Sequence, residues 1–152
     1  MTRTRTLIAF ILLGALLIFM NVQILQKERI KTEGETIYFE LAPVDPRAFM
    51  LGDYMALRYA HPLLNEDYQP MMTFIVTLDE HNVVTHAEPY IGGTLQDNQR
   101  LFNIQDQLRP TRFYFQEGLA PHYDKARYGA FKYIDADHFL LEHLTDAARN
   151  FL

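Results

Sequence analysis

The sequence contains no cysteine, and this absence removes several kinds of chemistry. Disulfide bonds, thiolate metal sites, cysteine nucleophiles and acylated lipoprotein anchors all require a thiol. The absence fits an oxidising compartment, where an unpaired thiol is a liability, although a cytosolic protein can lack cysteine too. The absence of cysteine therefore excludes these kinds of chemistry but does not determine the cellular compartment of the protein.

Serine and tryptophan are absent as well. Without serine, the chain has no nucleophile for a serine hydrolase or for an enzyme of the signal-peptidase type with a Ser/Lys pair. The missing nucleophiles favour a protein that is not an enzyme, and no motif in the sequence calls for a cofactor or a metal. The aromatic residues, 13% of the chain, are all phenylalanine and tyrosine, which suits the packing of β-sheets.

Positive charge is scarce outside the N-terminal region. The first 32 residues hold five basic side chains and one acidic side chain, which leaves 9 of the 14 basic and 18 of the 19 acidic side chains for the rest. An acidic body is a poor partner for nucleic acid, because phosphate groups are neutralised by clustered lysine and arginine. Nucleic-acid binding is therefore set aside.

The N-terminal region holds one long hydrophobic run. Residues 7–20 are uninterrupted by polar side chains, and Val22, Ile24 and Leu25 extend the run past Asn21 and Gln23. A helix over 7–25 would span ~28 Å, close to the ~30 Å hydrocarbon core of a bilayer. A cleaved secretory signal is the competing interpretation, but no small-x-small cleavage site follows the run. The sequence favours a retained transmembrane anchor.

The orientation of this anchor is less strongly encoded. Arg3 and Arg5 precede it and Lys27, Arg29 and Lys31 follow it, so the positive-inside rule is nearly balanced. A short basic N-terminal tail usually stays in the cytoplasm, which would place the remaining domain outside. The expected organisation is a basic tail (1–6), a transmembrane anchor (7–26), a juxtamembrane linker (27–35) and an extracytoplasmic β-rich domain (36–152).

The domain is predicted to consist of short strands. Alternating and β-branched residues between turn signals predict strands at 36–41, 54–59, 71–78, 83–86, 100–104, 112–115, 130–134 and 139–144. One helix is predicted over 118–128, with Gly129 as its C-terminal stop. Seven or eight short antiparallel strands with one helix indicate a mainly β fold, either a small barrel or a sandwich.

One motif gives the sequence a family resemblance. Residues 52–59 read Gly-Asp-Tyr-Met-Ala-Leu-Arg-Tyr, which resembles the signature of the bacterial GDYxxLxY proteins. Residues 41–47, 27–28, 113–115 and 126–129 are similar to the same family, so the resemblance covers nearly the whole chain. It implies a protein of the bacterial inner membrane with its domain outside the cytoplasm, encoded beside multi-pass membrane proteins. The family has no established activity, so the resemblance does not indicate which reaction, if any, the protein catalyses.

The residues around the motif form the candidate site. The hypothesis of a binding surface rests on Asp45, Arg47, Gly52, Asp53, Tyr54, Leu57 and Tyr59. Carboxylates, a guanidinium and phenols near one turn can bind a polar ligand, a cation or a partner. The same spacing also arises in a turn whose polar groups form hydrogen bonds and ion pairs with one another. Of the two interpretations, a purely structural role is favoured over binding.

Other polar clusters carry weaker signals. His81 and His86 flank a predicted hairpin, but two ligands do not make a metal site. Strand alternation separates His143 from His138 and Glu142, so surface or hydrogen-bonded histidines are the favoured interpretation. Acidic side chains of the kind that bind calcium occur at 66–67 and at 135 and 137. Neither pair lies in a loop with enough ligands for calcium, so solvent-exposed turns are the favoured interpretation.

The functional hypothesis is therefore an accessory or binding module held at a membrane. The face carrying the GDYxxLxY motif would dock on a multi-pass membrane protein, and Asn21 and Gln23 could add hydrogen bonds between membrane helices. The alternative is an envelope enzyme or a small-ligand-binding protein that uses Asp45, Arg47 and Asp53. A self-associating structural protein, pairing through exposed edge strands, is a third possibility.

Overall fold

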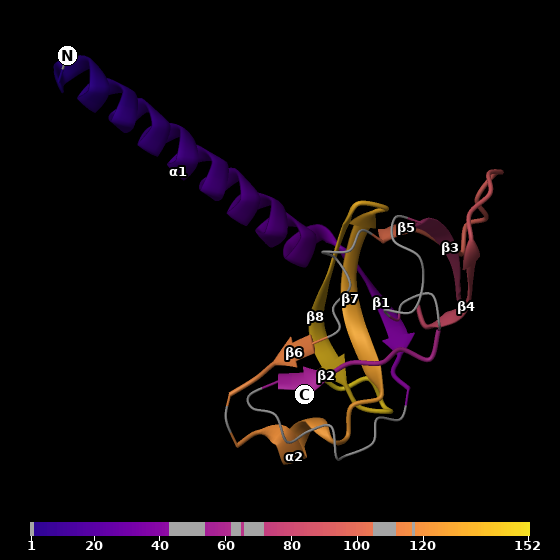
Figure 1. Ribbon diagram of the computed structural model, residues 1–152. Coiled ribbons are helices and arrows are strands. Elements are labelled where there is room, and N and C mark those ends of the chain that lie inside the picture. The colour runs from indigo at the N-terminus through magenta and orange to yellow at the C-terminus, as the bar shows by residue number, and fades with distance from the viewer. Residues whose placement is uncertain (1, 43–53, 62–64, 66–71, 105–111, 117) are drawn as a thin grey trace.

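The computed structural model describes residues 2–42, 54–61, 65, 72–104, 112–116 and 118–152. One long helix projects from a small domain of short strands (Figure 1). In chain order the elements are α1 (Thr2–Glu33), β1 (Glu35–Glu40), β2 (Tyr54–Ala56), β3 (Met72–Leu78), β4 (Val84–Pro89), β5 (Gln99–Ile104), β6 (Arg112–Tyr114), α2 (Ala120–Tyr123), β7 (Tyr128–Asp135) and β8 (His138–Thr145). The prediction of a mainly β domain after an N-terminal helix is confirmed.

Helix α1 is longer than the apolar run that predicted it. It covers 32 residues and includes 27–33, which the sequence analysis assigned to a linker. The large apolar side chains from Leu7 to Leu25 are exposed, and the helix is long and apolar enough to cross a membrane. Among its described side chains Ile30 alone is buried, near the end of α1 that contacts β7 and β8.

The junction between α1 and β1 is a close backbone contact. The Gly34 amide donates a hydrogen bond to the Ile30 carbonyl oxygen at 3.0 Å. A Cβ atom on Gly34 would overlap that oxygen and lie 3.1 Å from the Tyr133 nitrogen. The helix therefore ends against β7 without a spacer, and the junction requires a residue that has no side chain.

The strands form three antiparallel sheets, ordered β1–β7–β8, β2–β6 and β4–β3–β5. Strand β1 buries alternate residues, whereas β3 and β7 each bury three consecutive residues, 74–76 and 129–131. In β1, Ile37 and Phe39 are fully buried, and in β3 so is Val76. The hairpin predicted between 71–78 and 83–86 is confirmed as β3–β4.

The core is aromatic and centred on Phe39 and Phe102. Their ring centroids lie 5.4 Å apart with planes at 89°, an edge-to-face arrangement. Phe131 and Phe139 complete the cluster at 5.0 Å from Phe39 and 4.8 Å from Phe102, respectively. Each such pair stabilises a fold by about 0.5–1.5 kcal/mol beyond the area it buries. These four rings join the β1–β7–β8 sheet to β5 of the neighbouring sheet.

Backbone hydrogen bonds also connect these two sheets. The Tyr38 amide donates to the Asn82 carbonyl at 2.9 Å, and the Asn103 amide donates to the Ala136 carbonyl at 2.8 Å. The first bond ties β1 to the β3–β4 turn and the second ties β5 to the β7–β8 turn. The two sheets are thus held at both ends of their contact.

The predicted helix over 118–128 is wrong beyond its first turn. Helix α2 has four residues, and Gly129, predicted as a helix stop, lies inside β7, where it pairs with Phe39 and Leu144. The physical reason lies at Arg127. Its amide donates to the Thr145 carbonyl and its carbonyl accepts from the Leu41 amide, at 2.7 and 2.8 Å. Those bonds to neighbouring strands replace the bonds that a helix would need.

Candidate functional site

The segment 54–59 of the sequence motif shows the predicted alternation. Met55, Leu57 and Tyr59 are buried in the core, whereas Ala56 and Arg58 are exposed. Strand β2, the first half of the segment, pairs with β6 so that Tyr54 faces Tyr114 and Ala56 faces Arg112. The motif therefore presents one apolar face to the core and one face to the surface.

Tyr59 is the most deeply buried residue of the motif, with 1% of its surface exposed. Its ring lies 6.4 Å from the ring of Phe39 and 6.0 Å from that of Phe131. Burial raises the pKa of its phenol well above the ordinary value. The Asn65 side chain fixes the backbone here, because it accepts from the Tyr59 amide and donates to the Tyr59 carbonyl, both at 3.0 Å.

This burial concerns two members of the hypothesised binding set. Leu57 and Tyr59 contribute to the core, since the strand alternation turns both side chains inward. Tyr54 belongs to β2. The other four members, Asp45, Arg47, Gly52 and Asp53, lie outside the described residues. Among residues 55–59 of the motif, the exposed side chains are those of Ala56 and Arg58.

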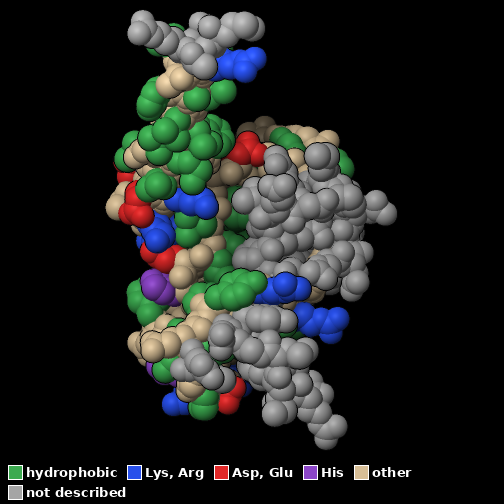
Figure 2. Space-filling view, turned by 60° about the vertical axis from the view of Figure 1, so that its left-hand side comes forward, with side chains coloured by type: hydrophobic (Ala, Val, Ile, Leu, Met, Phe, Trp, Pro, Cys, Tyr) green, Lys and Arg blue, Asp and Glu red, His purple; other side chains and the backbone are tan. Residues whose placement is uncertain are grey.

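A groove of about 800 Å³ lies beside this motif, at the junction of α1 with the domain. All three residues of β6 line it, as do Asp137 in the β7–β8 turn and residues 138–141 at the start of β8. The helix contributes Gln23, Ile24, Gln26, Lys27, Glu28, Ile30 and Lys31. Below the exposed apolar side chains of α1, charged side chains of both signs gather where the helix meets the domain (Figure 2).

Strand β6 is held in the wall of this groove from two sides. It pairs with β2 of the motif, and its Phe113 ring lies 5.4 Å from the Tyr123 ring of α2. Phe115, just after the strand, packs on the same tyrosine at 4.9 Å. Tyr114 points out of this packing and is 68% exposed. The GDYxxLxY segment thus positions the strand that forms one side of the groove.

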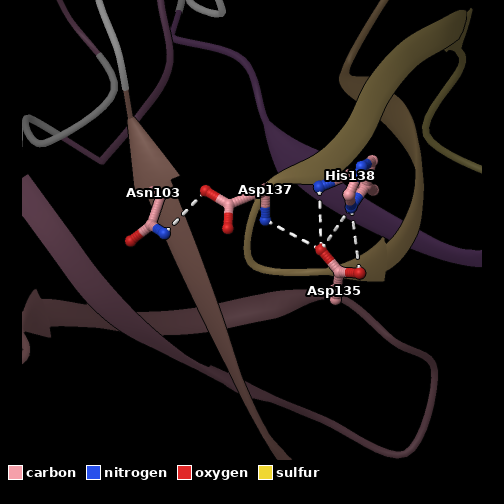
Figure 3. Close-up of polar contacts among 4 residues, drawn as sticks. All are labelled: Asn103, Asp135, Asp137 and His138. Atoms are coloured by element: carbon pink, nitrogen blue, oxygen red, sulfur yellow. Dashed lines mark hydrogen bonds and ion pairs between the residues drawn. The ribbon is translucent and has the colours of Figure 1, made fainter.

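A set of hydrogen bonds shapes the β7–β8 turn on the opposite wall. Asp135 Oδ1 accepts from the amides of Asp137 and His138, each at 3.0 Å, and lies 2.8 Å from His138 Nδ1 (Figure 3). Burial acts to raise the pKa of Asp135, but the bonds from His138 and Asp137 outweigh it and lower that pKa. The Asn103 amide group donates to Asp137 Oδ1 at 2.8 Å. The interpretation of 135 and 137 as turn residues is confirmed.

Three other histidines are placed separately. His81 lies in the β3–β4 turn, His86 pairs with Glu88 at 3.8 Å, and the His143 ring centroid lies 4.9 Å from that of Phe151 with the ring planes at 47°. Within the described ranges, no three His, Asp or Glu side chains are placed to hold a metal ion together. Glu142 occupies a bulge in β8, opposite the step from Ala130 to Phe131.

The groove was missed by the sequence analysis, which identified its components singly. Lys27 and Lys31 are four residues apart, the spacing of one helical face. Phe113 was noted within a family-like segment, and His138 was considered only as a metal ligand. No local spacing joins these residues, because they come from three segments that only the fold brings together.

Comparison with known proteins gives one match. The model of a protein family described as "GDYXXLXY protein" matches residues 16–142. The matched range includes the second half of the apolar run, the motif and the three segments that line the groove. No curated protein and no solved structure matches the chain.

Proposed function

Because the chain belongs to the GDYXXLXY protein family, whose function is uncharacterised, we propose that it is a membrane-anchored, non-catalytic accessory module of the bacterial envelope. In this proposal α1 crosses the inner membrane once and the domain lies outside the cytoplasm. The domain docks on a multi-pass membrane protein through the surface that carries the motif.

The continuity of α1 with the domain carries this proposal. The apolar side chains of residues 7–25 are exposed along the helix, and the helix runs into the domain without a flexible linker. A domain on a flexible linker would sample many positions above a membrane. A domain that joins its helix directly at Gly34 would stay at one distance from the membrane and in one orientation. Such a placement favours contact with a neighbouring protein in the same membrane.

The docking surface that we propose is the exposed face of β2 and β6. Ala56 and Arg58 lie on it, and Asp53 and Tyr54 precede them in the motif. Just after β2, the buried residues Leu57 and Tyr59 hold the segment that carries Arg58 against the core. Ala56 and Arg58 offer an apolar and a cationic contact, and arginine is enriched at protein interfaces, which favours protein association over chemistry on a small substrate.

Site-specific photocrosslinking in native membranes tests this proposal. A benzophenone amino acid placed at Ala56 or Arg58 of the full chain should yield one discrete adduct with a multi-pass membrane protein. The control position is Ile91, which is 97% exposed in the connection between β4 and β5, at the other side of the domain from β2 (Figure 1). The same reagent at Ile91 should give no such adduct.

The motif variant Asp53→Ala separates docking from folding. The proposal predicts that this variant loses the adduct and keeps the unfolding temperature of the parent chain. Adducts of equal yield at positions 56 and 91 would argue against a defined docking surface. An Asp53→Ala chain that unfolds would show that the motif is purely structural.

A further inference from the structure

The groove between α1, β6 and β8 lies at the height where a membrane presents its lipid head groups. If the hydrocarbon core ends near Leu25, Lys27 lies ~3 Å and Lys31 ~9 Å beyond it along the helix axis, at ~1.5 Å per residue. Gln23 and Ile24 also line the groove, so its surface is continuous with the apolar surface of α1. A molecule in the groove could therefore contact both regions of a bilayer leaflet.

The polar side of the groove is suited to an anion. Lys27 and Lys31 share one helical face, and within the described part of the chain neither makes an ion pair or a side-chain hydrogen bond. Arg29, between them, is instead paired with Glu33 at 2.7 Å and does not line the groove. Arg112 adds a third cation from β6. Two carboxylates also line the groove, Glu28 on the helix and Asp137 in the turn before β8, and Asp137 accepts a hydrogen bond from the Asn103 amide group.

The other side of the groove is apolar. Ile30 and Phe139 are buried in its floor, and Phe113 and Leu140 are half-buried in its walls. A free phosphate would leave these side chains without a partner. An amphipathic anion would contact the lysines with its head and the floor with its chains. The groove volume falls within the ~300–1,000 Å³ typical of pockets for small molecules.

We propose that this groove binds an anionic phospholipid, with its phosphate between Lys27 and Lys31 and the upper part of its acyl chains against Phe139 and Leu140. The proposal shares with the proposed function the condition that α1 crosses a membrane, and it does not require a protein partner. Charge complementarity selects this ligand, because three cations and two carboxylates line the groove, whereas acidic side chains outnumber basic ones by 18 to 9 in residues 33–152.

Native mass spectrometry of the full chain tests the proposal. The protein is released from neutral detergent in the presence of phosphatidylglycerol or of phosphatidylcholine with the same acyl chains. Phosphatidylglycerol should remain bound preferentially. Lys27→Gln and Lys31→Gln should each lower the bound fraction about fivefold, the effect of one basic residue near an anionic membrane surface. Lys27→Arg, which keeps the charge, should retain the lipid.

Arg29→Gln is the matched control, because it removes one charge at the same depth outside the groove. Equal retention of the two lipids, or an equal loss in Arg29→Gln, would overturn the proposal. Displacement of the lipid by millimolar inorganic phosphate would overturn the role of the acyl chains. A benzophenone at Leu140 in native membranes should crosslink to lipid, and a polypeptide adduct there would overturn the assignment of the groove. The adduct expected at position 56 is a separate result and tests protein docking alone.

Discussion

The Gly34 amide donates a hydrogen bond to the Ile30 carbonyl oxygen at 3.0 Å, and this contact closes α1 at the point where the domain begins. Gly34→Ala would insert a Cβ atom that overlaps this oxygen and crowds the Tyr133 nitrogen. Both neighbours are backbone atoms, so relief requires a shift of the helix or of β7. We expect the substitution to destabilise the domain by about 1–3 kcal/mol, the usual cost of overpacking.

Thermal unfolding of the full chain in detergent measures this effect, and Gly14→Ala provides the control. A Cβ atom at Gly14 has nothing within 4 Å, and alanine favours a helix over glycine. Gly14→Ala should leave the unfolding temperature of the domain unchanged. Equal behaviour of the two variants would mean that the junction is not tightly packed.

The ion pair of Arg100 with Glu35 provides a second test of this junction. Arg100 Nε and Nη2 donate to the two oxygens of Glu35 at 3.0 and 3.3 Å, and both side chains are about two-thirds buried. Arg100→Lys removes the two-point contact and should cost about 1 kcal/mol in the free energy of unfolding. Arg29→Lys alters an exposed pair and should cost less than about 0.5 kcal/mol. A larger loss in Arg29→Lys than in Arg100→Lys would contradict this ranking.

The motif offers a contrast between two adjacent residues. Tyr59→Ala should cost about 3–5 kcal/mol, because it leaves a cavity beside Phe39 and Phe131. Arg58→Ala changes an exposed side chain and should alter stability by no more than about 0.5 kcal/mol. Denaturant unfolding of both variants measures the difference. Similar losses in the two variants would argue against the core assignment of Tyr59.

Two turn carboxylates give the domain a defined acid sensitivity. The amide of Val83 and the side chain of Asn150 donate to Asp79 and Asp146, respectively, and these bonds lower the pKa of each carboxyl below its ordinary 3.8. The folded state then binds fewer protons than the unfolded state. Their contribution to stability is therefore complete above the unfolded pKa and is lost as the pH falls through the folded pKa.

The double variant Asp79→Asn, Asp146→Asn should consequently show a weaker loss of unfolding temperature between about pH 5 and pH 3 than the parent chain. Differential scanning calorimetry at both pH values measures that slope. An unchanged slope would show that other carboxylates control the acid response.

Local patterns predicted much of this fold and little of the groove. Alternation placed residues 55, 57 and 59 on one face of a strand, which the structure buries, and the turn signals after Leu78 identified the β3–β4 hairpin. The helix over 118–128 was overextended because Leu119, Tyr123 and Ala126 have helical spacing, whereas strand pairing at Arg127 determines the local structure. The groove depends on residues 27, 113 and 138, which are far apart in the sequence. Their proximity produces no periodic pattern that a single sequence could reveal.

The absence of cysteine permits a direct test of the central claim, which is that α1 crosses a membrane and holds the domain outside the cytoplasm. Three variants of the full chain each carry one cysteine, Thr4→Cys, Leu13→Cys and Ala56→Cys. Intact cells permeable only in their outer envelope are treated with a membrane-impermeant maleimide, and a second sample is treated after the inner membrane is opened.

We expect labelling of position 56 in intact cells, of position 4 only after the inner membrane is opened, and of position 13 in neither sample. Labelling of position 4 but not 56 in intact cells would reverse the orientation. Labelling of position 13 together with release of the chain as a soluble protein would contradict the membrane anchor itself.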